Sequence, residues 1–377
     1  MKINQLKGKS VGIAVSGGLD SCTITRWLVD HGVDVFCFTA DLGQPDEKDM
    51  NEIRNRMLDC GALDSTVVVA VDQLAEAGLQ LIQAQATYEG GYWNTTGIAR
   101  HITVAVLLES MKKRGITILS HGSTGRGNDQ VRFQLATNMI EPDFEVYAPW
   151  RDEAFLEQFG GRKEMIDFCN RNNIPITATY EKPYSTDANL LGLTHEAGKL
   201  ESLQTPANFI TPGMGKHPKD APDKAEHMTV RFEKGRPTEI NGKLCSLVEA
   251  FELTNEIGGR NGVGIGIHVV ENRFVGIKSR GVYESPGMEL LGQCYEYLLQ
   301  LILDRRSRRV FNQLSDLIAE QIYEGYWFDP ATQSQLAAIQ PFKRLASGEI
   351  TVTLYKGNIS FHSAVSIPHS LYSEEKG

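Results

Sequence analysis

The chain has 377 residues, of which 41% are hydrophobic and 23% charged, and its formal net charge is −9 at pH 7. This length exceeds what one hydrophobic core usually supports, so we expect two domains. No apolar run approaches the roughly 20 residues that span a bilayer, and the polar start of the chain is unlike a signal peptide, which together predict a cytoplasmic protein. The acidic charge argues against nucleic acid as a ligand, because phosphate backbones are bound by basic surfaces.

The first part of the chain alternates between strand and helix patterns. Strands are predicted at 11–15, 34–40, 65–71 and 116–121, and helices at 21–31, 46–60, 74–88 and 96–113. This alternation predicts an α/β fold with a doubly wound parallel sheet, whose ligands bind at the carboxyl ends of the strands. We therefore expect segments 16–21, 41–44 and 122–129, which follow strands, to share that edge.

The pattern changes after about residue 180. Hairpins are predicted at 228–240 and at 350–363, helices at 247–257 and 288–302, and a Pro-, Gly- and Lys-rich loop at 205–223. These elements predict a second, α+β domain with antiparallel strands. We divide the chain into a first domain at 1–175, a second domain at 176–355 and a C-terminal tail at 356–377.

The turn between the first strand and the first helix has the sequence Ser16-Gly17-Gly18-Leu19-Asp20-Ser21. It matches neither the mononucleotide loop, which needs a lysine, nor the dinucleotide loop. Its glycines let backbone N–H groups approach a ligand, and a helix N-terminus behind them favours a phosphate. Two glycines after a strand can also make only a tight turn. With its hydroxyls and its Asp, however, the turn resembles the pyrophosphate loop of the ATP pyrophosphatases, which split ATP into AMP and pyrophosphate.

A second glycine-rich segment lies at 121–133 and contains Gly122, Gly125 and Gly127. Asp129 and Arg132 follow at a spacing that puts them on one face of a starting helix. A carboxylate can hold an ammonium group and a guanidinium can hold a carboxylate, so the pair fits a zwitterionic amino acid. The alternative is a capped helix with a solvated ion pair.

Two further segments, at 181–196 and 271–284, are crowded with hydroxyls and charges. Taken alone, each is predicted to be a loop, either at a binding site or on a solvated surface. The six cysteines include no C-x-x-C pair, which predicts free thiols in a reducing compartment.

Together these segments closely resemble the argininosuccinate synthases, from the loop at Ser16 to about Tyr355. The resemblance includes segments 40–44, 92–96, 149–150 and 327–328, and segments 94–96 and 184–187 are similar to the branch with longer bacterial chains. It implies a C–N ligase of arginine biosynthesis and the urea cycle that joins citrulline and aspartate through a citrullyl-AMP intermediate. ATP and Mg²⁺ would be the cofactors, and a homotetramer the assembly.

The resemblance also implies roles for individual residues. ATP would be bound by Ala14, Val15, Ser16, Gly17, Gly18, Leu19, Asp20, Ser21, Cys22, Ala40, Gly122, Thr124 and Asp187. Citrulline would be bound by Tyr92, Asn128, Arg132, Ser185, Thr194, Glu196, Glu271 and Tyr283, and aspartate by Thr96, Thr124, Asn128 and Asp129. Ser16, Asp20, Asp129 and Arg132 are the candidate catalytic residues, and no metal ligands are identified.

Three departures from the family pattern stand out. Cys22 replaces the hydroxyl residue that commonly closes the phosphate loop, and because a thiol is a weaker donor, we expect weaker nucleotide binding. Gly97 replaces a serine of the citrulline pocket, and the chain stops at Gly377, where relatives usually continue into a tail used for tetramer contacts. Two alternatives remain open: another pyrophosphate-loop enzyme, such as an amidotransferase-linked synthetase or a tRNA thiolase, and a nucleotide or amino-acid sensor.

Overall fold

The computed structural model describes residues 1–375 except 48, 126, 177–183 and 275. The first domain is built on a parallel sheet in the order β3-β2-β1-β4-β5. Its strands are β1 (Ser10–Ala14), β2 (Asp34–Asp41), β3 (Asp64–Val69), β4 (Ile118–His121) and β5 (Glu145–Tyr147). The predicted doubly wound sheet is confirmed. The strand order reverses between β1 and β4, so the loops after these two strands border the crevice in which such sheets bind ligands.

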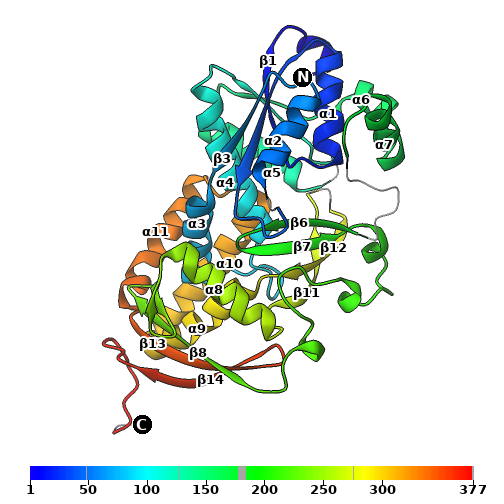
Figure 1. Cartoon of the computed structure of the whole chain (residues 1–377). Helices are drawn as coiled ribbons and strands as arrows, with labels where there is room; N and C mark the ends of the chain where they lie inside the picture. The colour runs from blue at the N-terminus through cyan, green and yellow to red at the C-terminus, as the bar shows by residue number, and fades with distance from the viewer. Residues whose placement is uncertain (48, 126, 177–183, 275, 376–377) are drawn as a thin grey trace.

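Helices cover both faces of this sheet (Figure 1). One face packs against α1 (Leu19–Asp30), α2 (Met50–Asp59), α6 (Glu153–Gln158) and α7 (Arg162–Arg171). The other packs against α3 (Val71–Ala84), α4 (Thr95–Lys112) and α5 (Asp129–Ile140). The predicted helix at 46–60 is shorter than expected because Asp49 caps its start, accepting a hydrogen bond from the backbone N of Asn51 at 2.8 Å.

The second domain contains an antiparallel sheet in the order β11-β12-β7-β6. Its strands are β6 (Ser185–Asn189), β7 (Gly192–Glu196), β11 (Ile265–Asn272) and β12 (Lys278–Glu284). The prediction of loops at 181–196 and 271–284 was therefore wrong for most of both segments, although 181–183 and 275 lie outside the described residues. Polar residues such as Thr194 are buried within these strands and hide the apolar alternation that marks a strand in sequence.

A second antiparallel sheet has the order β10-β9-β8-β13-β14. It comprises β8 (Glu226–Glu233), β9 (Arg236–Ile240), β10 (Lys243–Leu244), β13 (Gly348–Tyr355) and β14 (Asn358–Val365). Both predicted hairpins are present, and the proposed domain limit at 355 falls within the β13–β14 hairpin. The helices of this domain are α8 (Leu247–Arg260), α9 (Pro286–Ile302), α10 (Arg305–Glu324) and α11 (Pro330–Leu345), of which the sequence analysis predicted only the first two.

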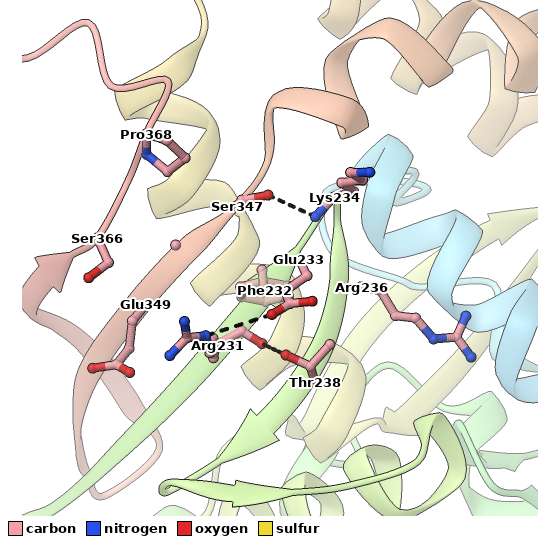
Figure 2. Close-up of a pocket in the computed structure, with 11 residues that line it drawn as sticks. Arg231, Phe232, Glu233, Lys234, Arg236, Thr238, Ser347, Glu349, Ser366 and Pro368 are labelled. Atoms are coloured by element: carbon pink, nitrogen blue, oxygen red, sulfur yellow. Dashed lines mark hydrogen bonds and ion pairs between the residues drawn. The ribbon is translucent and has the colours of Figure 1, made fainter.

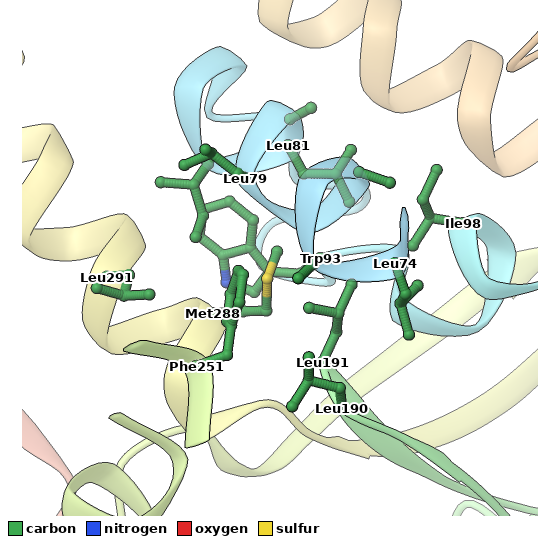
Figure 3. Packing of buried hydrophobic residues seen from close by; sticks show 14 of the residues in the cluster. Leu74, Leu79, Leu81, Trp93, Ile98, Leu190, Leu191, Phe251, Met288 and Leu291 are labelled. Carbon is green, nitrogen blue, oxygen red and sulfur yellow. The ribbon is translucent and has the colours of Figure 1, made fainter. Parts of the chain in front are cut away.

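The largest hydrophobic core is shared between the two domains. Helix α3 packs against α8, α9, α10 and α11 of the second domain. Figure 3 shows its leucines among side chains of α4, α8 and α9, of the turn between β6 and β7, and of the segment before α4. The labelled residues are Leu74, Leu79 and Leu81 of α3, Trp93, Ile98, Leu190, Leu191, Phe251, Met288 and Leu291. Gly78 allows this close approach, because a Cβ at that position would lie 2.6 Å from Cδ2 of Leu191.

Within the described residues, none of the helices combines the length and the apolar character needed to cross a membrane. All six cysteines are free, as predicted, and only Cys245 is partly exposed.

Candidate active site

The predicted phosphate loop connects β1 to α1. Gly17 adopts a φ of +74°, which favours glycine, and the backbone N of Ser16 donates to Oγ of Ser21 at 3.0 Å. Nη1 of Arg56, on α2, donates to the carbonyl oxygen of Gly17 at 2.7 Å. The side chain of Ser21 therefore links the two ends of the loop, and the guanidinium of Arg56 stabilises its middle. The sequence analysis did not identify Arg56.

Cys22 lies beneath this loop, and its side chain is fully buried. Its Sγ is 3.8 Å from the carbonyl oxygen of Gly17, and its backbone N donates to the carbonyl oxygen of Gly18 at 3.0 Å. The thiol thus contacts the loop backbone from below. That Cys22 weakens nucleotide binding stays a prediction.

Asp20 joins the phosphate loop to the second glycine-rich segment. Its Oδ1 accepts a hydrogen bond from Nε1 of Trp150 at 3.1 Å, and burial raises the pKa of its carboxyl group. Gly122, after β4, lies directly beside it, because a Cβ at Gly122 would be 3.4 Å from Cβ of Asp20. The two loops that border the sheet crevice are therefore in contact.

A network of four charged side chains links the predicted aspartate and nucleotide sites. Nε of Arg100 donates to Oδ2 of Asp129 at 2.9 Å, and its Nη2 donates to Oδ2 of Asp187. Nη1 of Arg132 donates to Oδ1 of Asp129 at 2.7 Å. Burial raises the pKa of Asp129, but the two guanidinium groups outweigh it and lower that pKa to about 2. Asp129 and Arg132 share a helix face as predicted, but here they bind each other.

Three predicted citrulline residues converge on Tyr323 of α10. Its hydroxyl donates to Oε2 of Glu271 at 2.7 Å and accepts from Nδ2 of Asn128 at 3.0 Å. Its backbone oxygen accepts from Nε and Nη2 of Arg132 at 3.1 and 2.8 Å. Burial raises the pKa of Glu271, and its hydrogen bond from Tyr323 opposes this.

Aromatic rings and hydroxyl groups form the next part of the site. The rings of Tyr92 and Tyr283 stack with their centroids 3.9 Å apart. The backbone N of Thr96 donates to the hydroxyl of Tyr92 at 3.2 Å, and Oγ1 of Thr96 is hydrogen-bonded to Oγ1 of Thr194 at 2.6 Å. Residues predicted for citrulline and for aspartate are therefore in direct contact.

The β6–β7 hairpin adds Ser185, Asp187, Thr194 and Glu196. Ser185 pairs with Glu196, and Asp187 with Thr194, in its antiparallel register. The Glu196 side chain is exposed to solvent, yet partial burial by surrounding protein and the carboxylates of Asp129, Glu271 and Asp187 raise its pKa to about 7.

Some predicted residues make fewer side-chain contacts with the rest of the site. Ala14 is the last residue of β1 and Ala40 the last but one of the adjacent β2. The backbone oxygen of the exposed Thr124 accepts a hydrogen bond from the backbone N of Gly127 at 3.3 Å. Gly97 lies against Arg132, since a Cβ there would be 3.6 Å from Cζ of Arg132.

The sequence analysis missed Arg56, Arg100 and Tyr323. Arg100 could have been found, because it follows Thr96 by one helical turn and so shares its face of α4. The sequence around Arg56 and Tyr323 gave no indication of a binding role, since each lies on a helix (α2 and α10) that contains no recognisable motif.

A separate surface cavity of about 500 Å³ lies in the second domain between β8, β9 and β13 (Figure 2). Arg231, Lys234, Arg236 and Glu349 are among the residues lining it. Arg236 is already paired with Glu76 at 2.7 Å. None of the residues predicted for substrates lines this cavity, so it is not the candidate active site. No group of three or more His, Cys, Asp or Glu among the described residues is arranged to hold a metal ion.

Comparison with known proteins agrees with this geometry. The argininosuccinate synthase N-terminal HUP domain matches residues 10–175, and the argininosuccinate synthase C-terminal domain matches residues 184–377.

Argininosuccinate synthases from three bacteria match nearly the whole chain. That of Rhodopirellula baltica is 44% identical over 369 residues, covering 97% of this chain and 91% of the relative. The enzyme of Aquifex aeolicus is 40% identical, and the match covers 98% of this chain and 91% of the relative. The enzyme of Thermotoga maritima is 37% identical, and the match covers 97% of this chain and 90% of the relative.

A solved structure of a predicted subunit of a tRNA methyltransferase from Methanocaldococcus jannaschii also matches. It is 16% identical, covers 43% of this chain and 74% of that chain, and has a TM-score of 0.28. This TM-score is too low to support any conclusion. The two family models and the three relatives, in contrast, agree along almost the entire sequence. The chain belongs to the argininosuccinate synthase family.

Proposed function

We propose that this chain joins L-citrulline to L-aspartate in an ATP-dependent reaction that forms argininosuccinate and releases AMP and pyrophosphate. Membership of the argininosuccinate synthase family supports this reaction. The observation that carries it to individual residues is the network in which Arg100 binds both Asp129 and Asp187. This network connects the residues proposed for aspartate with those proposed for ATP.

In the first step, the ureido oxygen of citrulline attacks the α-phosphate of ATP, forming citrullyl-AMP. The loop at 16–21 binds the departing pyrophosphate, because its backbone N–H groups and the N-terminus of α1 favour negative charge. The proposed nucleotide site is completed by Ala14, Ala40, Gly122, Thr124 and Asp187. Citrulline is held by Tyr92, Tyr283, Ser185, Thr194, Glu196 and Glu271.

In the second step, the amine of aspartate attacks the activated carbon of citrulline, and AMP leaves. Asp129 holds the aspartate amine near that carbon, and Thr96, Thr124 and Asn128 bind the rest of the molecule. The aspartate ammonium group must lose a proton to solvent before it attacks, because Asp129, with a pKa of about 2, is too weak a base to accept it. Placement of the two reactants can by itself supply roughly 7–11 kcal/mol of the barrier.

We propose that Mg²⁺ accompanies ATP. The residues present fit this ion, since Mg²⁺ bound with nucleotides usually takes only one or two protein carboxylates and keeps several waters. Asp20, the carboxylate of the phosphate loop, is the residue that would hold it. When bound, the ion would neutralise charge on the phosphates.

We also propose a homo-oligomer in the cytoplasm. The β13–β14 hairpin and the segment after it expose Phe361, Val365, Leu371 and Tyr372 by 49–64%, and this apolar edge suits a second copy of the chain. The free thiols fit a reducing compartment. Light scattering across a dilution series would test the assembly, and a monomer at every concentration would contradict it.

The reaction itself is tested by measuring pyrophosphate release from ATP with each substrate omitted in turn. We expect release to require citrulline, and argininosuccinate to appear only with aspartate as well. Arginine or ornithine should not replace citrulline. Equal release without citrulline would contradict the proposal, and binding of the ligands with no release at all would favour a sensor.

A further inference from the structure

We propose that Tyr323 is a positioning residue for the substrate amino acids, holding Asn128, Glu271 and Arg132 in their binding geometry. This inference rests on the proposed function. Tyr323 belongs to α10, whereas Arg132 belongs to α5, Glu271 to β11 and Asn128 to the loop before α5. One side chain of the second domain therefore aligns groups from both domains.

The hydroxyl of Tyr323 lies at the centre of a hydrogen-bond cluster. It accepts from Nδ2 of Asn128 at 3.0 Å and has two acceptors within reach, Oε2 of Glu271 at 2.7 Å and the backbone oxygen of Asn272 at 2.8 Å. A phenol carries a single proton, and a carboxylate oxygen is a stronger acceptor than a backbone carbonyl oxygen, so the shorter contact with Glu271 is the favoured one. The same hydroxyl thus orients an amide and a carboxylate.

Asn128 is fixed from its other side as well. Its Nδ2 also donates to the backbone oxygen of Asn272 at 2.9 Å, and its Oδ1 accepts from the backbone N of Phe274 at 3.2 Å. The amide therefore ties the loop before α5 to the end of β11. Tyr323 completes this connection from a third element.

The rest of Tyr323 holds Arg132. Its backbone oxygen accepts two hydrogen bonds from that guanidinium, whose Cζ also lies 5.0 Å from the centre of the Tyr323 ring. The opposite support comes from Tyr88, whose ring stacks on that of Tyr323 at 3.8 Å and whose hydroxyl accepts from Nδ2 of Asn272 at 2.6 Å. With only 3% of its surface exposed, Tyr323 has little freedom to move.

The test is Tyr323→Phe, which keeps the ring and the backbone oxygen and removes only the hydroxyl. We expect KM for citrulline to rise about tenfold or more, since hydrogen bonds to charged groups are among the stronger ones. KM for aspartate should also rise, because Asn128 is shared, whereas KM for ATP should stay near the wild-type value. The matched control is Tyr297→Phe, which removes a hydroxyl that donates to the backbone oxygen of Ile359 at 3.4 Å, between α9 and β14.

The pH profile provides a readout that a purely structural role would not change. Removing the donor should raise the pKa of Glu271. In a Glu196→Gln background, where Glu196 no longer titrates, the acid limb of kcat/KM for citrulline should therefore move to higher pH in Tyr323→Phe and not in Tyr297→Phe. The other titratable or charged groups that act on Glu271 or respond to it are Asp129, Arg132, Arg273, Glu196, Tyr88 and Tyr92. All of them are unchanged in both variants, so a difference between the variants reports on the Tyr323 hydroxyl.

A double-mutant cycle with Glu271→Gln completes the test, since Tyr323→Phe should cost less when the carboxylate is already absent. Unchanged KM values and an unchanged acid limb in a folded Tyr323→Phe enzyme would overturn this inference alone. If the wild-type chain failed to release pyrophosphate with citrulline, the proposed function would fail first, and the two results are therefore distinguishable.

Discussion

The guanidinium of Arg100 binds the carboxylate of Asp129 at 2.9 Å while also holding Asp187. One side chain of α4 therefore neutralises a carboxylate after β4 and another on β6. Without it, Arg132 would be the one remaining cation among the described residues that pairs with either carboxylate. This arrangement leads to the first prediction.

Arg100→Gln should reduce kcat/KM for aspartate at least about tenfold and also raise KM for ATP. Removing one partner of a buried charge network leaves the others uncompensated, at a typical cost of about 3–5 kcal/mol, which the partial exposure of Arg100 reduces here. Steady-state kinetics with each substrate varied would measure both effects. Arg260→Gln, which breaks ion pairs with Glu226 and Glu256 instead, should leave both constants unchanged.

Asp129→Asn should damage the second step more than the first. The carboxylate is proposed to hold the aspartate amine, and no charge of ATP or citrulline is assigned to it. Positional isotope exchange in ATP with citrulline present should persist, while argininosuccinate formation falls about a hundredfold or more. If exchange disappears together with product formation in the folded variant, Asp129 serves the nucleotide or citrulline site instead.

The same carboxylate predicts a dependence of stability on pH. Because its pKa falls from 3.8 to about 2 on folding, the folded state favours the ionised form. This contribution is fully present above about pH 4 and is lost as the pH falls towards 2. Urea unfolding between pH 2 and 6 should therefore show a smaller loss of unfolding free energy with acid in Asp129→Asn than in the wild type. Parallel curves would show that the Asp129 pKa is unshifted.

Glu196 predicts a pH effect on citrulline binding near neutrality. With a pKa of about 7, its carboxylate ionises across the range in which the enzyme is assayed. If the ionised form accepts hydrogen bonds from citrulline, kcat/KM for citrulline should rise with pH through about 7. Glu196→Gln should flatten that rise, whereas the exposed Glu201→Gln should keep it. A rise of unchanged size in Glu196→Gln would assign the titration to another group.

Arg56 predicts an effect on the phosphate loop. Arg56→Ala removes the hydrogen bond to the carbonyl oxygen of Gly17 and should raise KM for ATP about tenfold, with little change for citrulline. Arg54→Ala is a close control, because Arg54 lies on the same helix but donates to the backbone oxygen of Ser65 at 3.1 Å. Equal effects of the two substitutions would point to a general loosening of α2.

The sequence was most informative where function depends on local backbone. A phosphate loop needs glycines next to a strand and a helix start, so segment 16–21 could be singled out as a candidate from the sequence, and its place between β1 and α1 is as expected. The spacing of Asp129 and Arg132 likewise predicted a shared helix face, and their ion pair is present at 2.7 Å.

What could not be predicted depends on contacts between distant segments. Nothing near Tyr323 in the sequence indicates that its hydroxyl meets Glu271 and Asn128, because these contacts form only when α10 packs beside β11 and α5. The strands at 185–196 were missed for a related reason. Their buried residues include Thr194 and His195, and Nε2 of His195 pairs with Oε1 of Glu284 at 2.5 Å, a partner far along the chain.

Helix α3 has a consequence for how the chain folds as it leaves the ribosome. Its buried surface is completed by α8 to α11, which are synthesised long after residue 84. At about 5–20 residues per second, this delay lasts on the order of ten seconds. During that time the nascent parallel sheet carries a helix whose leucines face water. A chaperone that shields this helix would therefore be expected to raise the yield of folded enzyme, and a fragment ending near residue 175 would aggregate.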